Sequence, residues 1–515
     1  MADEMAAADR PGPAPADPGH MDVAEFRRYG YEVVDWIAGY WETLERRPVQ
    51  PADSPPGAVA AALPAAPPED GTGFDGVLAD LDRIVAPGLT HWQHPGFFGY
   101  FPANTSGPSV LGDLVSAGLG VQGMLWATSP ACTEIETVML DWLAQLLDLP
   151  SRFRSDSGGG GVIQDSASSA TLVATLAALH RASGGRWRTD GTTGGYTAYT
   201  STEGHSSIEK AARIAGIGDD NVRLIETDPT TMAMRPAALR AALAADVAGG
   251  RRPAIVVATI GTTSTTAIDP VERIGPICAE YGVWLHVDAA YAGAAAVCPE
   301  LRWTHAGLER ADSYCFDPHK WLLTGFDCDA FWVADRAGLV AALTVLPEFL
   351  RNAASESGAV IDYRDWQVPL GRRFRALKLW FVLRWYGARG LRAHVRSAVE
   401  HAAWFAGRVA ADDRFEVVAP GPFALVCFRL RADLPDGRQE RADSLNSPQE
   451  RADALNSRLL GRVNSDGSVF LTHTRVGGRF TLRLAVGAPR TERRHLVAAW
   501  DLISRTADEL LGLDQ

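Results

Sequence analysis

One lysine, in the stretch ADSYCFDPHKWLL, has surroundings that suit chemistry on a carbonyl compound. Lys320 follows a short strand-like run, Pro318 and His319, and it precedes Trp321 and two leucines. Apolar neighbours hydrate an ammonium group poorly, which lowers the pKa of the amine. A free amine near neutral pH attacks carbonyl carbons, so Lys320 is a candidate nucleophile. A surface lysine at the end of a strand is the alternative that this stretch alone leaves open.

The elements around this lysine alternate between strand-like and helix-like segments from about residue 158 onwards. Strands are predicted at YTAYTS, PAIVVATIG, VWLHVD and SYCF, and helices at residues 236–247 and 270–281. Such alternation predicts an α/β fold whose mostly parallel sheet has helices on both faces. Polar residues cluster just past the strand ends, where open α/β sheets bind their ligands. The residues in question are Thr263, Asp288 and Lys320.

A glycine-rich turn, GGGGVIQDSAS, leads into a predicted helix, SSATLVATLAALHRA. Its first residues, Ser166, Ala167 and Ser168, are small or carry hydroxyl groups. The N-terminus of a helix presents unpaired N–H groups and the positive end of its dipole, so this turn is a candidate phosphate site. An ordinary serine cap has the same sequence.

Aromatic residues are dense in the segment THWQHPGFFGYFP, which includes Trp92, Tyr100 and Phe101. The interleaved prolines and glycines break any regular element, so we expect a loop. An aromatic loop suits the wall of a pocket for a flat apolar ligand, and packing in the core is the alternative.

Composition and charge exclude several classes of protein. The chain has 515 residues, of which 46% are hydrophobic and 22% charged, as in a globular protein of more than one domain. A net charge of −13 argues against nucleic acid and anionic membrane surfaces as partners. No apolar segment reaches the ~18 residues of a membrane span. The six cysteines lie far apart without zinc-type spacing, which predicts no metal site and a reduced, cytoplasmic setting.

We predict four parts along the chain. Residues 1–20 form a disordered tail, and residues 21–105 a helical segment that packs on a partner subunit. Residues 106–385 form the large α/β domain and residues 386–515 a small C-terminal α+β domain. In the last part QERADSLNS nearly repeats as QERADALNS, which suggests a solvated loop and helix to which we assign no function.

Together the motifs resemble those of the aromatic L-amino-acid decarboxylases (group II decarboxylases), which depend on pyridoxal phosphate (PLP). The similarity runs from about residue 21 to the C-terminus through THW…FFGYFP, SPACTEIETVMLDWL, GVIQDSAS, HSSIEKA, HVDAAYAG, DPHKWLL and DYRDWQVPLGRRFRALK. The resemblance implies PLP fold type I, with a mostly parallel central sheet and a smaller C-terminal α+β domain. It also implies PLP as cofactor, an aromatic L-amino acid as substrate, and a homodimer with active sites at its interface.

The family's site residues carry over position by position. Lys320 resembles the lysine that bonds covalently to the cofactor, with His319 beside it. Asp288 resembles the partner of the pyridine nitrogen, and His205 the imidazole that stacks on the ring and helps to hold the substrate carboxylate. The other implied cofactor contacts are Ser166, Ala167 and Ser168 at the phosphate, Thr263 at the ring hydroxyl and Ala290 against the ring face.

The implied substrate pocket contains Trp92, Tyr100, Phe101 and Gly371. Met124, where relatives often have phenylalanine, matches a residue that one subunit lends to the other and gives a more pliable wall. Gly371 leaves room for a bulky ring, but phenylalanine, tyrosine, DOPA and tryptophan all remain open as substrates. Asp317 stands where relatives often have asparagine at the phosphate. A carboxylate repels a phosphate, so Asp317 is expected to turn away or to bind through its backbone.

A further departure, Phe349 in the sequence PEFL, bears on the product. Decarboxylases of the family carry a tyrosine here, whose hydroxyl protonates the carbon from which carbon dioxide departs. Phenylalanine has no proton to give, and losing a positioned acid costs ~10²–10⁴ in rate. In relatives with phenylalanine here, oxygen as co-substrate gives an aldehyde, ammonia and hydrogen peroxide. The alternatives are an amine product, with His205 or water as the acid, and a catalytically silent PLP-binding protein.

Overall fold

A computed structural model describes residues 19–51, 54–71, 73–192, 194–345, 360–419, 421–431 and 447–512. The chain divides into two compact units, Met1–Thr90 and His91–Gln515. The predicted tail lies outside the described residues, apart from Gly19 and His20. None of the described helices combines the length and the apolarity that crossing a bilayer requires.

The first unit begins with a helix, α1 (Val23–Thr43), as the sequence predicts. Asp22 caps this helix and forms a capping box with Glu25. The remaining elements of the unit are short: η1 (Leu44–Arg46), α2 (Ala58–Ala61), α3 (Phe74–Asp80), η2 (Leu81–Val85) and η3 (Ala86–Gly88). No residue of α1 is buried, so the first unit itself covers few of the apolar side chains of this helix.

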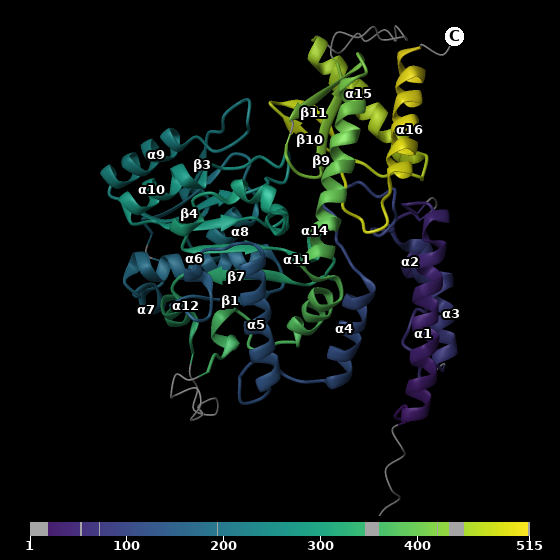
Figure 1. The fold of residues 1–515 in the computed structure, drawn as a ribbon, viewed down its shortest axis with the longest axis horizontal. Coiled ribbons are helices and arrows are strands. Elements are labelled where there is room, and N and C mark those ends of the chain that lie inside the picture. The colour runs from purple at the N-terminus through teal and green to yellow at the C-terminus, as the bar shows by residue number, and fades with distance from the viewer. Residues whose placement is uncertain are drawn as a thin grey trace, which may run out of the picture. The chain divides into compact units, whose positions relative to one another are not determined.

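In the second unit the described residues form a seven-stranded sheet (Figure 1). Its strands are β1 (Gly160–Gln164), β2 (Tyr196–Ser201), β3 (Val222–Ile225), β4 (Arg252–Thr259), β5 (Trp284–Asp288), β6 (Ser313–Phe316) and β7 (Asp329–Val333). The order is β1-β7-β6-β5-β4-β2-β3, with β7 antiparallel to β1 and β6 and the other pairs parallel. The predicted mostly parallel sheet is confirmed, but the glycine-rich turn is in part a strand, β1.

Alternation of side chains along the strands builds two cores, one on each face of the sheet. In β4, Ile255 and Val257 belong to one core, and Val256 and Ala258 belong to the other. The core that contains Ile255 and Val257 also includes the small residues of α6, which pack closely on the strands. The helices of this region are α4 (Gly107–Leu119), α5 (Pro130–Leu146), α6 (Ala167–Ser183), α7 (Trp187–Asp190), α8 (Ser207–Ile214), α9 (Pro236–Ala248), α10 (Val271–Tyr281), α11 (Pro318–Trp321) and α12 (Arg336–Leu343).

A long helix, α14 (Arg375–Ala410), leads to a smaller antiparallel sheet. This sheet has the order β10-β11-β9-β8, and helices α15 and α16 accompany it. The bounds are β8 (Phe415–Ala419), β9 (Leu425–Leu430), α15 (Pro448–Ser465), β10 (Thr472–Val476), β11 (Arg479–Ala485) and α16 (Arg493–Leu511). The predicted C-terminal α+β part is therefore present. Its predicted start falls inside α14, next to Gly387, whose φ of 59° interrupts the helix.

The second copy of the repeated sequence forms the first half of α15. Its Ala452, Leu455 and Asn456 are buried, and Asn456 hydrogen-bonds with both backbone groups of Leu430 on β9. The prediction of a solvated segment is therefore wrong for this copy. The first copy, except Ser447, lies outside the described residues.

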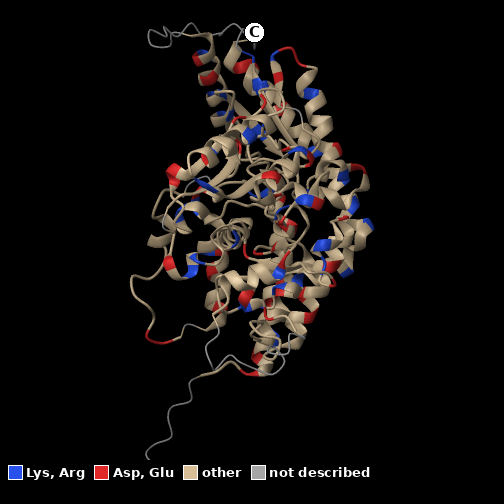
Figure 2. Cartoon of the chain, turned by 90° about the vertical axis from the view of Figure 1, so that its left-hand side faces the viewer, with Lys and Arg blue, Asp and Glu red and all other residues tan. Residues whose placement is uncertain are grey.

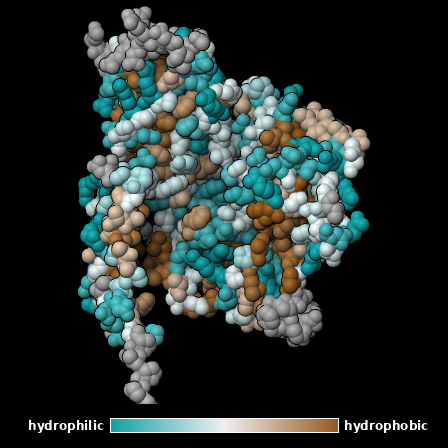
Figure 3. Space-filling model, turned by 180° about the vertical axis from the view of Figure 1, so that it is seen from behind, coloured by the Kyte–Doolittle hydropathy of each residue, from teal (hydrophilic) through white to brown (hydrophobic). Residues whose placement is uncertain are grey.

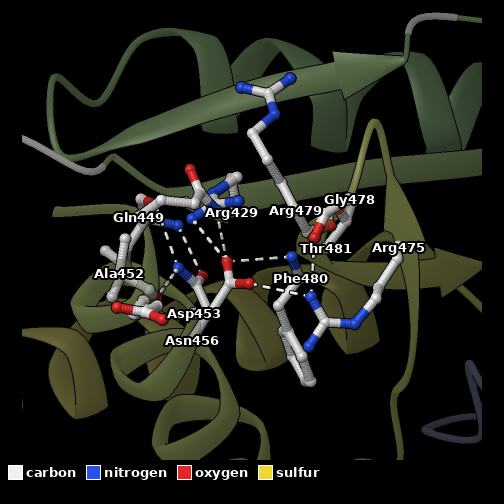
Figure 4. A network of polar contacts seen from close by, with 12 residues as sticks. Arg429, Gln449, Ala452, Asp453, Asn456, Arg475, Gly478, Arg479, Phe480 and Thr481 are labelled. Atoms are coloured by element: carbon white, nitrogen blue, oxygen red, sulfur yellow. Dashed lines mark hydrogen bonds and ion pairs between the residues drawn. The ribbon is translucent and has the colours of Figure 1, made fainter. Parts of the chain in front are cut away.

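Asp453 of α15 is the centre of a polar network that ties this helix to the small sheet (Figure 4). Its carboxylate accepts hydrogen bonds from Gln449 Nε2 at 2.6 Å and from the Phe480 backbone N at 3.0 Å. It also pairs with Arg475 at 3.0 Å and with Arg429 at 3.2 Å. The Arg429 side chain is only 1% exposed, so Asp453 compensates a buried charge.

We expect Asp453→Asn to lower the free energy of unfolding by about 3 kcal/mol, because Arg429 would keep its charge without its nearest carboxylate. Urea denaturation measures this loss. Arg475→Ala is the matched control, since its side chain is 62% exposed and its pair with Asp453 is worth less than about 1 kcal/mol. Equal losses in the two variants would contradict the role given to burial.

Acidic and basic residues are interspersed along the chain (Figure 2). Neither sign gathers into one broad stripe in that view.

Candidate active site

A cavity of about 370 Å³ opens at the carboxyl ends of β4, β5 and β6 in the second unit. The loop with the aromatic segment, the start of α6 and the turn before α8 contribute to its wall. The predicted site residues that line it are Trp92, Tyr100, Phe101, Ser166, Ala167, Ser168, His205, Thr263, Asp288, Ala290, Asp317, His319 and Lys320. The chain thus brings together, in one cavity, predicted site residues that are spread in sequence from Trp92 to Lys320.

Lys320 lies in α11, the single helical turn that follows β6. Its Nζ atom is 2.6 Å from Oδ2 of Asp317, three residues earlier in the same turn. Burial disfavours the ammonium form, but the nearby carboxylates of Asp317 and Asp288 outweigh it, so the pKa of Lys320 is raised. The predicted lowering of this pKa is wrong, because the apolar neighbours in sequence count for less than the acidic neighbours in space.

Asp288 is the last residue of β5, and it is 5% exposed. Its Oδ1 accepts a hydrogen bond from the backbone N of Ala290 at 3.0 Å. Burial raises the pKa of Asp288, and Lys320 opposes this effect. A carboxyl group with raised proton affinity at the floor of a cavity is suited to share a proton with a ring nitrogen.

The two predicted histidines have different surroundings. Nδ1 of His205 accepts from the Ser207 backbone N at 3.1 Å, so a neutral ring carries its proton on Nε2, and the side chain is exposed. Nδ1 of His319 accepts from the Cys328 backbone N at 3.0 Å, and its Nε2 lies 3.7 Å from Asp317. Burial lowers the pKa of His319, with Asp317 opposing. His205 is therefore free to contact a ligand, whereas His319 is held against Asp317.

Asp317 connects the lysine to the start of α6. Its Oδ1 accepts from the Ala167 backbone N at 3.1 Å, while Oδ2 pairs with Lys320. Burial would raise the pKa of Asp317, but Lys320 and His319 outweigh it and lower that pKa. The ammonium of Lys320 and the positive end of α6 both attract this carboxylate, and how Asp317 responds to a bound phosphate stays a prediction.

The aromatic segment contributes both to the cavity and to the core. Trp92 and Tyr100 stack with their ring centroids 5.4 Å apart, and each is more than a third exposed. Phe101 stacks on Tyr291 at 3.8 Å with an interplanar angle of 7°. The intervening Phe97 and Phe98 are buried, so for these two the alternative of core packing is correct.

Several residues of the cavity wall are absent from the sequence prediction. Arg483 of β11 reaches from the small sheet and donates to the carbonyl oxygens of Thr263 at 2.7 Å and Ser264 at 3.1 Å. Its guanidinium also lies 5.3 Å from the ring centroid of Phe101. No local pattern reveals a contact across 220 residues, although Tyr291 could have been found from its place in HVDAAYAG. The missed residues are Pro102, Ala103, Thr259, Gly261, Tyr291, Phe326 and Arg483.

Two predicted pocket residues are not among those that line the cavity of the single chain. The Met124 carbonyl accepts from the Arg364 backbone N at 3.1 Å, and the Gly371 carbonyl accepts from Gln367 Nε2 at 3.4 Å. Phe349 lies outside the described residues. For Met124 the contribution to a partner's pocket stays a prediction.

The donor set fits PLP on several independent counts. The cavity offers an amine, a buried carboxyl group, an exposed imidazole and a flat aromatic wall. At its side, Ser166 precedes α6 without a side-chain capping hydrogen bond, and Ser168 follows in the first turn of that helix. Such a helix start suits a phosphate group. Among the described residues no cluster of three or more His, Cys, Asp or Glu side chains could hold a metal ion. The fold and the site together define a PLP-dependent enzyme.

Comparison with known proteins gives the family. The pyridoxal-dependent decarboxylase conserved domain matches residues 56–431. The chain is 44% identical over 494 residues to phenylacetaldehyde synthase of Arabidopsis thaliana, covering 95% of this chain and 97% of the relative. It is also 44% identical to aromatic-L-amino-acid decarboxylase of Mus musculus, with 96% and 100% covered. The chain belongs to the pyridoxal-dependent decarboxylase family.

A solved structure agrees with this assignment and with PLP fold type I. The structure of Oryza sativa TDC with PLP and tryptamine has a TM-score of 0.91 and 42% sequence identity. The match covers 96% of this chain and 100% of that one. PLP is thus the cofactor of the enzyme described here.

Proposed function

We propose that the enzyme removes the carboxyl group of an aromatic L-amino acid and releases the corresponding aryl acetaldehyde. The observation that carries the first half is the single cavity shared by Lys320, Asp288 and His205 beside the aromatic pair Trp92 and Tyr100. The relatives at 44% identity include an aromatic amino acid decarboxylase and an aldehyde synthase, which supports this substrate class.

Each residue has a distinct role in the proposal. When bound, PLP supplies an electron-withdrawing ring that allows the α-carboxyl group to leave as carbon dioxide. Lys320 holds the cofactor covalently and, once released, moves protons at the substrate nitrogen. Asp288 keeps a proton at the pyridine nitrogen, and the Nε2–H of His205 donates to the substrate carboxylate. The N-terminus of α6, with Ser166 and Ser168, binds the phosphate.

The second half of the proposal rests on Phe349, and its support is sequence alone. The amine product requires a proton at the carbon that has lost carbon dioxide, and phenylalanine has none to give. Oxygen then takes two electrons instead. One substrate, one O2 and one water give one aldehyde, one CO2, one ammonia and one H2O2, so the reaction balances.

A plain decarboxylase that releases the arylalkylamine is the second candidate. It is favoured by the exposed His205, whose Nε2–H lies at the cavity and could protonate the same carbon.

Product analysis separates these candidates. The purified, PLP-loaded protein is incubated with phenylalanine, tyrosine, DOPA and tryptophan in turn, and CO2, aldehyde, H2O2 and amine are measured. We expect aldehyde and H2O2 in amounts equal to CO2 for at least one substrate. Amine equal to CO2 without H2O2 would contradict the aldehyde product and keep the decarboxylase. Absence of CO2 with every substrate would indicate a catalytically silent protein.

We also propose a homodimer, because large apolar side chains lie open on the single chain. Figure 3 shows apolar side chains gathered in patches on one face. In the second unit, α4 and α14 form an apolar groove of about 570 Å³ in which Leu111 is 48% and Trp385 is 74% exposed. In the first unit, α1 has no buried residue, so the N-terminal segment of each copy is expected to pack on the other copy.

The six free, buried cysteines suit a cytoplasmic location.

We expect Trp385→Glu to weaken dimerisation by on the order of 30-fold, because exposed tryptophans in apolar grooves are frequent hot spots worth ~2 kcal/mol. Analytical ultracentrifugation measures the dissociation constant. Trp303→Glu is the matched control, since Trp303 is 60% exposed in another element, η7 (Pro299–His305). An unchanged dimer in Trp385→Glu would contradict the interface.

A further inference from the structure

A buried acid beneath the active site, Asp329, has no role in the function proposed above. It is the first residue of β7, it pairs with Gln164 of β1, and it is 0% exposed. Neither of its carboxyl oxygens accepts a hydrogen bond from a described residue. An ionised carboxylate in such a place would lack both solvent and donors, which is strongly unfavourable.

The antiparallel register of β6 and β7 pairs Phe316 with Ala330, so the next step sets Asp317 opposite Asp329, and the two carboxyl groups interact. Two ionised carboxylates only accept hydrogen bonds, so this contact becomes a bond when one of them carries a proton. Asp317 already accepts from the Ala167 N–H at 3.1 Å and pairs with Lys320 at 2.6 Å, and both contacts favour its ionised form. Asp329 has no such partner, so the proton belongs on Asp329.

The charge states of the other titratable groups around Asp329 also favour a proton on Asp329. Burial raises the pKa of the Tyr314, Cys315 and Cys328 side chains, which therefore stay neutral, and burial lowers the pKa of His319. Among the described residues, Lys320 is the cation that acts on Asp329, and it faces the three carboxyl groups of Asp288, Asp317 and Asp329. A proton on Asp329 removes excess negative charge from a site that also has to hold a phosphate.

We propose that Asp329 is a protonated carboxylic acid that donates a hydrogen bond to Asp317 and thereby positions the carboxylate that pairs with Lys320. Asp329 is a positioning residue, since it acts on Lys320 through Asp317. Its hydrogen bond draws charge away from Asp317 and weakens the hold of Asp317 on the Lys320 ammonium. The amine is thus released more readily for bonding to the cofactor. This inference rests on the cofactor site proposed around Lys320 and not on the identity of the product.

The protonation state is tested on the cofactor-free protein by infrared difference spectroscopy at neutral pH. We expect the C=O stretch of a protonated carboxyl group in the wild type and its loss in Asp329→Asn. Asp312→Asn is the matched control, because Asp312 pairs with Arg181 at 2.7 Å, so the band should stay. A wild-type spectrum without this band, or a band that Asp329→Asn retains, would overturn the proposal whatever the enzyme produces.

The effect on Lys320 is tested by the pH midpoint of the visible absorbance of the PLP-loaded protein. Asp329→Asn replaces one neutral donor by another, so the midpoint should stay within about 0.3 pH units of the wild type. Asp329→Leu removes the donor. Asp317 should then hold the proton on the Lys320 nitrogen, which is joined to the cofactor in the loaded protein, more strongly. The midpoint should shift upward by about one pH unit, which is a tenfold change in proton affinity.

The two variants also distinguish a protonated Asp329 side chain from an ionised one. If Asp329 were ionised, Asp329→Asn would remove a negative charge near Lys320 and lower the midpoint by a unit or more, which would overturn the proposal. An unchanged midpoint in Asp329→Leu would overturn the positioning role. If Asp329→Leu does not fold, Asp329→Ala gives the same comparison with a smaller side chain.

Discussion

Replacing Lys320 by alanine is expected to abolish covalent attachment of PLP and to lower turnover by roughly 10²–10⁴-fold or more. Lys320 is the one lysine among the described residues that line the cavity, so no neighbouring amine can take its place. The visible absorbance of the loaded protein measures attachment, and CO2 release measures turnover.

Lys210→Ala is the control for this experiment. Lys210 is an exposed residue of α8, the helix that follows His205, so its removal should change neither absorbance nor turnover. If Lys320→Ala kept the absorbance band of the wild type, the assignment of the cavity as the PLP site would be wrong.

Phe349→Tyr is expected to convert the main product from aldehyde to amine. The added hydroxyl restores a general acid, and a positioned acid accelerates protonation by ~10²–10⁴, enough to outrun the reaction with oxygen. The ratio of amine to aldehyde and the yield of H2O2 measure the change with the preferred substrate.

Phe326→Tyr is the matched control, because Phe326 lines the cavity and gains the same hydroxyl at a different position of the sequence. We expect its product ratio to stay close to that of the wild type. An unchanged ratio in Phe349→Tyr would contradict the role of this position. Equal shifts in both variants would mean that any phenol in the cavity suffices.

Much of the large domain could be predicted because its strands and helices follow from local patterns in the sequence. The apolar runs of β4 and β5 are buried on both faces, and helices with clear boundaries separate them. Since the carboxyl ends of parallel strands meet at one edge, residues after different strands, such as Thr263 and Asp288, could be expected in one cavity. The structure confirms their proximity.

What could not be predicted depends on contacts that have no signature in the local sequence. β7 runs antiparallel beside β6, and this return brings Asp329 within reach of Asp317. The contacts of the Asp317 side chain with the start of α6 and with Lys320 likewise form only after the fold has brought these elements together. The sequence thus predicts most of the residues that line the cavity, whereas their proton affinities follow from tertiary packing.

Through the hydrogen bonds of Arg483, the C-terminal region forms part of the cavity wall. Its Nε and Nη2 atoms bond to Ser264 and Thr263, and its Nη1 atom bonds to Thr472 of its own sheet. A planar guanidinium with three fixed acceptors specifies orientation as well as distance. A chain truncated before β8 would therefore lose one wall of the cavity. The large α/β region and the C-terminal region are not expected to function when they are produced separately.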